Sequence, residues 1–168
     1  LPSGSITLDM YWSYSTDQVH EALRTLGATG NVSILPEGGT TGNKAISMVS
    51  TQSNYNPRGA PNDAIKIGSL LFDYSGSGTG IEFGDVLQHG TTTVTGTGTG
   101  VLDVTNAAAT ATCGAVLHIW GTALAADTYS IKVQHSADDS TYNDLITFTL
   151  NGSVLGSERI VVASGAIQ

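Results

Sequence analysis

The pattern of apolar and polar positions predicts a chain built mainly of β-strands. Between residues 6 and 14, large apolar side chains alternate with polar ones, and this period of two is typical of a strand with one buried face. Further apolar runs bounded by turn residues predict strands at residues 31–35, 44–53, 64–74 and 81–87. Within the third of these runs the apolar parity slips at Gly68-Ser69, which predicts a β-bulge there.

One segment has the period of a helix instead. Val19, Ala22, Leu23 and Leu26 follow the i, i+3, i+4, i+7 stripe of an amphipathic helix. Ser15 can cap its first turn, and Gly27 can end it. We therefore expect one short helix near residues 16–27. A helix of this length is marginal alone, so it should pack on a sheet.

Glycine, proline and threonine mark the loops and a boundary between two parts. Residues 36–43 and 54–63 are rich in Gly, Pro and Asn, which predicts loops. Residues 91–100 are a low-complexity run of Thr and Gly, which predicts an edge strand or a linker and places a domain boundary near residue 90. We expect residues 1–90 to form one β domain with the helix, and residues 91–168 to form a small β-sandwich of jelly-roll or immunoglobulin-like type. The strands expected in the second domain lie at residues 101–105, 115–120, 129–135, 144–150 and 158–163, separated by turn residues such as Asn151-Gly152 and Gly156-Ser157.

The charge excludes several classes of partner. The chain has 6 Lys and Arg against 14 Asp and Glu, which gives a net charge of −8. A sequence-independent grip on nucleic acid needs clustered cations, and so does binding to anionic lipid. No apolar run approaches the roughly 20 residues of a membrane span. An acidic protein repels DNA rather than binding it.

No catalytic, cofactor or metal site is predicted. The four histidines lie in none of the familiar catalytic or zinc motifs, and Cys113 is the single cysteine, which excludes an intrachain disulfide. The acidic segment around Asp138 and Asp139 could supply oxygen ligands to Ca²⁺, but it lacks the EF-hand spacing, and a β-turn that starts with Asp explains the same residues. Tyr142, in that segment, is the best candidate for stacking on a sugar.

Several motifs occur in an order that resembles a known family. The strand at residues 5–12 leads into the helix Asp17–Leu23, then Leu35-Pro36-Glu37-Gly38, then a strand that ends in Gln52–Pro57. This order is similar to that in the tail tube proteins of long-tailed phages, with Tyr11-Trp12-Ser13 in place of the family's Trp-Asp. The segment Val133–Leu145 resembles the β-sandwich domain that many such phage proteins carry at the C-terminus.

The resemblance implies a virion structural protein with no enzymatic activity, assembled in the host cytoplasm into the phage tail. Its copies would form hexameric rings that stack into a hollow tube, alongside other tail proteins, with double-stranded DNA as passing cargo. Contacts between rings would involve Glu37 and Gly38 of one loop and Asn54, Tyr55 and Arg58 of the other. The acids expected to line the lumen are Asp9, Asp73 and Asp85. The second domain would lie outside the tube, where it could bind host glycans through Tyr142.

Two other classes of protein share these features. A capsid decoration protein or head fibre would have the sandwich but would form trimers or monomers. A carbohydrate-binding module would bind glycans through residues 91–168. A hydrolase is a more remote alternative because it needs paired carboxylates in a cleft.

Overall fold

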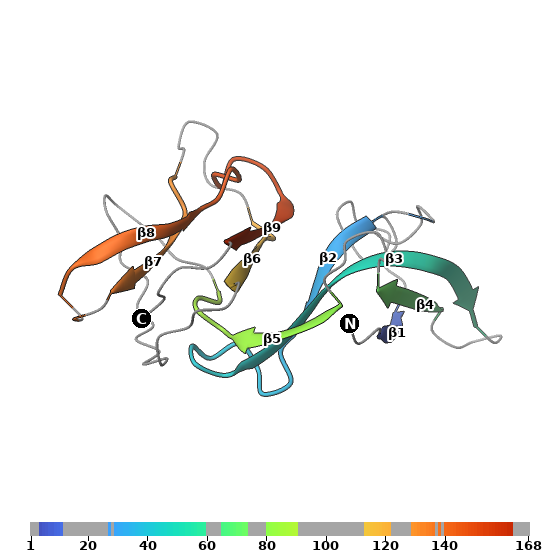
Figure 1. The fold of residues 1–168 in the computed structure, drawn as a ribbon. Helices are drawn as coiled ribbons and strands as arrows, with labels where there is room; N and C mark the ends of the chain where they lie inside the picture. Colours follow the sequence, from blue (N-terminus) through green and yellow to red (C-terminus); the bar gives the residue numbers. More distant parts are fainter. Residues whose placement is uncertain are drawn as a thin grey trace. The chain divides into compact units, whose positions relative to one another are not determined.

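The computed structural model describes residues 4–11, 27, 29–59, 65–73, 80–90, 113–121, 129–136, 138 and 140–162. Nine strands run through these residues, and no helix occurs among them (Figure 1). The mainly β class predicted from the alternating pattern is therefore confirmed. The helix predicted near residues 16–27 lies outside the described residues, apart from Gly27, which is in a turn. No helix in the described part of the chain is long and apolar enough to cross a membrane.

The chain divides into two compact units. The first consists of residues 1–36 and 45–84, and the second of residues 37–44 and 85–168. The segment predicted as the first loop therefore belongs largely to the second unit, although it connects two strands of the first. The domain boundary near residue 90 stays a prediction.

The first unit contains one antiparallel sheet in the order β1-β4-β3-β2, with β5 also paired to β3. The strands are β1 (Ser5–Tyr11), β2 (Thr29–Ile34), β3 (Lys44–Arg58), β4 (Lys66–Asp73) and β5 (Ile81–Asp85). Each of them overlaps a strand predicted from the sequence. The end of β3 was predicted wrongly: it runs on to Arg58, so the loop expected at residues 54–63 is a strand over its first five residues.

The β-bulge lies on β3 and not on β4. The pairing of β3 with β4 shifts between Gln52 and Asn54, which leaves Ser53 as the extra residue. The pairing of β1 with β4 runs without a break through Gly68 and Ser69, so the bulge predicted there is wrong.

The buried face of β3 combines one apolar and two polar side chains. Met48, Ser50 and Gln52 alternate along the strand, and all three are buried. The polar side chains have partners: Ser50 Oγ donates to the carbonyl of Gly30 at 3.4 Å, and Gln52 Nε2 donates to the carbonyl of Asn54 at 3.0 Å. Because buried polar groups are costly only when unpaired, this face is compatible with a stable sheet.

The second unit contains two antiparallel pairs of strands. β6 (Cys113–Ile119) pairs with β9 (Gly156–Val162), and β7 (Lys132–Ser136) pairs with β8 (Tyr142–Thr147). Four of the strands predicted for this half are confirmed, and the fifth, at residues 101–105, lies outside the described residues. The turn predicted at Gly156-Ser157 is wrong, because both residues open β9. The buried apolar side chains described in this unit are Val86, Ile146 and Phe148.

Glu158 links β9 to the segment that follows β8. Its carboxylate accepts hydrogen bonds from the backbone N–H groups of Thr149 at 2.8 Å and Leu150 at 2.9 Å, and from Thr149 Oγ1 at 3.0 Å. These bonds hold the pKa of Glu158 below its ordinary value, with the Leu150 N–H as the largest cause. One acidic side chain thereby satisfies two backbone donors that lie outside the strand pairs.

Candidate functional site

The predicted loop that contains Glu37 and Gly38 is closed by its own hydrogen bonds. Glu37 Oε2 accepts from the backbone N–H of Lys44 at 3.1 Å, and the carbonyl of Glu37 accepts from Asn43 Nδ2 at 2.7 Å. Gly38 has a φ of +85°, a conformation that favours glycine. Glu37 and Gly38 are both exposed. Both residues are therefore accessible for a contact with another molecule.

Asp85, one of the three predicted lumen acids, has a cationic partner. Lys44 Nζ lies 2.6 Å from Asp85 Oδ1, and the Asp85 side chain is 17% exposed. The hydrogen bond to Asp85 raises the pKa of Lys44, which favours the charged ammonium. The ammonium of Lys44 therefore offsets the negative charge of Asp85.

Asp9 is paired in the same way with Arg58, across the intervening strand β4. Asp9 lies opposite Gly68, and Gly68 lies opposite Asn56, two residues before Arg58 on β3. The Arg58 guanidinium forms an ion pair with Asp9. A Cβ at Gly68 would stand 3.2 Å from Arg58 Nη2 and 3.5 Å from Asp9 Oδ1. The glycine leaves room for the arginine side chain to cross.

Asn54, Tyr55 and Arg58 were predicted to lie on a loop, and the structure places them on β3. Pro57 suggested a loop because proline cannot donate to a ladder. It is tolerated because, within the described residues, the pairing of β3 with β2 ends at Thr51, and Pro57 lies beyond it. Asp73, the third lumen candidate, is the last residue of β4. The roles assigned to these residues stay predictions.

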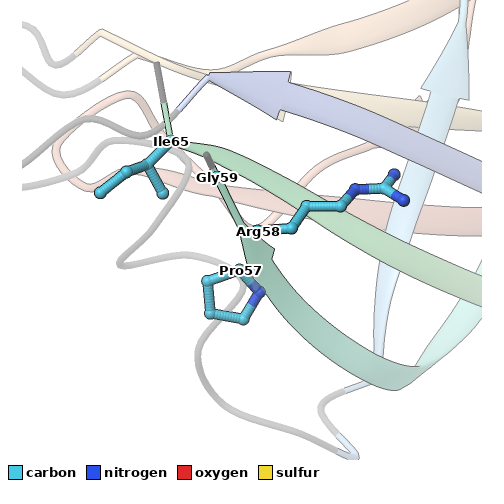
Figure 2. A pocket seen from close by; sticks show the side chains of 4 residues that line it. All are labelled: Pro57, Arg58, Gly59 and Ile65. Atoms are coloured by element: carbon cyan, nitrogen blue, oxygen red, sulfur yellow. The ribbon is translucent and has the colours of Figure 1, made fainter. Parts of the chain in front are cut away.

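A shallow hollow lies where β3 ends and β4 begins. It has a volume of about 360 Å³ and is lined by Pro57, Arg58, Gly59 and Ile65. Figure 2 shows the Arg58 side chain extending away from Pro57 and Ile65. Since the guanidinium is already paired with Asp9, the hollow brings together no acid–base pair and no nucleophile from the described residues.

Tyr142 opens β8 on the β7–β8 hairpin, opposite Ser136, and is 54% exposed. Two positions along the same strand, the carboxylate of Asp144 accepts from Lys132 Nζ at 2.6 Å and from Gln134 Nε2 at 2.9 Å. These bonds, that from Lys132 first, lower the pKa of Asp144. The hairpin thus presents an aromatic ring beside an ordered polar network, and a glycan contact at Tyr142 stays a prediction.

The acidic segment at the tip of this hairpin forms a turn around Asp138. Its carboxylate accepts from the backbone N–H groups of Thr141 at 2.7 Å and Ser140 at 3.0 Å, and from the hydroxyls of Ser136 at 3.1 Å and Thr141 at 3.2 Å. The turn begins with Asp138, so it is the β-turn that the sequence offered as the alternative to a Ca²⁺ site. In the part of the chain that the structure describes, no group of three or more His, Cys, Asp or Glu could hold a metal ion.

The turn should make the second unit sensitive to acid. Hydrogen bonds, led by that from the Thr141 N–H, hold the pKa of Asp138 far below its ordinary value, and the pKa values of Asp144 and Glu158 are lowered as well. A carboxyl whose pKa is lower folded than unfolded contributes stability above its unfolded pKa and loses it as pH falls through the folded pKa. We expect the melting temperature to fall steadily below about pH 4.

Circular dichroism melts between pH 7 and pH 2 measure this effect. Asp138→Asn should melt lower at pH 7 and should show a shallower fall in acid, since asparagine does not titrate. Neither Ca²⁺ nor a chelator should shift the melting temperature. An acid response in Asp138→Asn as steep as that of the unaltered chain would contradict this account.

The described histidines form no catalytic arrangement. His118 lies on β6 opposite Ser157, and burial lowers its pKa. His135 lies on β7, and His20 falls outside the described residues.

His89 contacts Trp120, with ring centroids 5.2 Å apart. Sequence reasoning missed this pair. Its signal was weak: Trp120 follows an apolar run directly and precedes a glycine, which puts it at a strand end where a large apolar side chain is open to solvent.

The chain matches no protein-family model, and it is significantly similar to no curated protein and to no solved structure. Its function therefore has to be argued from its own residues.

Proposed function

We propose that this chain is the repeating subunit of a phage tail tube, a virion protein whose copies form rings that stack into a conduit for DNA. The observation that carries the proposal is the sheet of the first unit, which has β1 and β2 as the terminal strands of its described order. A terminal strand is a template for pairing with another chain. Pairing of β1 of one copy with β2 of the next is heterologous, and heterologous contacts close into rings or continue as filaments.

The charge supports the same function. The net charge of −8 disfavours retention of DNA on a conduit wall, because it repels phosphates. The ion pairs of Asp9 and Asp85 mean that this repulsion comes from other acids of the chain. Asp73 stays a candidate for the lumen, and the exposed Glu37-Gly38 turn and the Asn54–Arg58 end of β3 stay candidates for contacts between rings. The second unit, as the proposed outer domain, would form a sandwich on the tube surface.

Negative-stain electron microscopy of the concentrated full chain tests the proposal. We expect stacked rings or hollow tubes. Thr7→Lys, which adds a cation at an exposed position of β1, should reduce assembly, since lysine on an edge strand discourages pairing with another chain. Thr147→Lys, at an exposed position of β8, is the matched control and should assemble as before. Monomers or isolated trimers alone would refute the tube and favour a capsid decoration protein or a head fibre.

A further inference from the structure

His89 lies between a glycine turn and the indole of Trp120. On one side, a Cβ built at Gly39 would meet the imidazole at 2.2 Å from Nδ1, 2.3 Å from Cγ and 2.6 Å from Cε1. On the other side, the ring of Trp120 is inclined by 45° to the imidazole, with 5.2 Å between the centroids. All three residues belong to the second unit. The imidazole therefore packs directly on backbone that has no side chain, and it supports the indole from one side.

The turn beneath His89 is attached to the segment that carries it. Gly42 N–H donates to the carbonyl of Val86 at 2.9 Å, and Val86 N–H donates to the carbonyl of Asn43 at 2.8 Å. Thr41 Oγ1 reaches the carbonyl of Leu87 at 3.5 Å, and Lys44 pairs with Asp85 at 2.6 Å. Since Val86 is buried, this double connection fixes His89 relative to Gly39. The segment that carries His89 is thus attached to the turn by two backbone hydrogen bonds and two side-chain contacts.

Trp120 remains 59% exposed despite this support. An exposed tryptophan is a large apolar surface in water, and a soluble protein gains no stability from leaving it there. An aromatic ring that is already held in place loses little conformational freedom when a ligand stacks on it. These two facts are typical of a binding platform.

The surroundings indicate an uncharged ligand. Thr40, Thr41 and Gln88 flank the turn and His89 in the chain and are exposed, uncharged hydrogen-bonding groups. The cation closest in sequence to the Gly39 turn is Lys44, and it is paired with Asp85. A phosphate or a nucleic acid would need a cation that is not committed elsewhere, and the net charge of −8 repels both. A sugar ring has an apolar face for the indole and hydroxyls for polar neighbours, and it carries no charge.

We propose that Trp120, held by His89 and Gly39, is a stacking platform for the pyranose ring of a neutral glycan. Trp120 is the contact residue, and His89 and Gly39 are positioning residues. The platform is separate from Tyr142, and it does not depend on whether the chain forms a tube.

Glycan binding by the full chain tests the platform, with an array of neutral hexose and N-acetylhexosamine oligosaccharides as the probe. We expect binding to at least one neutral glycan, which Trp120→Ala weakens about tenfold or more and Trp120→Phe weakens less. Phe83→Ala is the matched control, because it removes another exposed aromatic ring, and it should bind like the unaltered chain. In a Trp12→Phe background, Trp120 is the single tryptophan, and its fluorescence should change when the bound glycan is added.

A cycle of variants then tests the positioning residues. Gly39 has no positive φ, so Gly39→Ala strains no backbone and acts only by displacing His89. We expect Gly39→Ala to weaken glycan binding several-fold in the unaltered chain and to have no further effect in His89→Ala. Circular dichroism establishes that each variant is folded. The proposal is refuted if the folded chain binds no neutral glycan, if Trp120→Ala binds as well as the unaltered chain, or if only an organic cation changes the fluorescence of Trp120.

Discussion

Replacing Phe148 with Ala should lower the free energy of unfolding of the second unit by about 3–5 kcal/mol, the usual cost of removing a buried phenyl ring. Phe148 follows β8 directly and is 8% exposed, and its backbone N–H donates to the carbonyl of Ile131 at 3.0 Å. The described apolar core of this unit is small, so few neighbours can move to fill the space. Urea unfolding followed by the fluorescence of Trp120, in a Trp12→Phe background, measures the effect.

Thr147→Ala provides the comparison for this prediction. Thr147 directly precedes Phe148 but is exposed, and exposed substitutions usually change stability by less than about 0.5 kcal/mol. A loss of less than about 1 kcal/mol in Phe148→Ala would show that the ring is not part of the core. A loss in Thr147→Ala of the same size as in Phe148→Ala would show that the chain segment, rather than the ring, carries the stability.

The strands of this protein were predictable because each has a local signal. The alternation from Ile6 onward predicts β1 without any knowledge of its partner, and the turn residues Asn151-Gly152 separate β8 from β9 as expected. The end of β3 was not predictable in this way. Asn54, Asn56 and Pro57 all have turn propensities, but pairing with β4 along the whole segment overrides them. Strand ends depend on the neighbouring strand, and no single segment of sequence contains that information.

The candidate site was harder to predict than the fold because its contacts join distant residues. Asp9 meets Arg58 only because Gly68, on a third segment, lies between them without a side chain. Asp85 meets Lys44 only when the turn and the end of β5 come together. Read alone, each acid resembles a free charge, whereas the structure pairs both Asp9 and Asp85 with a cation. The Trp120–His89 contact has the same origin, since neither residue has a motif around it.

The pairing of β6 with β9 leads to the second large prediction: Gly114→Ala should destabilise the second unit. Gly114 lies opposite Val161, and a Cβ there would stand 2.9 Å from the backbone carbonyl oxygen of Ile160 and 3.3 Å from Cγ2 of Val161. Atoms this close cannot be relieved by rotating a side chain, because the nearest one belongs to the backbone of β9. The strands must move apart, and overpacking of this kind typically costs about 1–3 kcal/mol.

Gly84→Ala is the matched control, because Gly84 also lies on a strand, has no positive φ and has nothing within 4 Å of a built Cβ. There the substitution should be neutral or slightly stabilising, since alanine loses less conformational freedom on folding than glycine does. Urea unfolding of both variants should therefore separate the steric effect from the general effect of replacing glycine in a strand. If Gly114→Ala proves as stable as Gly84→Ala, β6 and β9 cannot lie as close together as the structure places them.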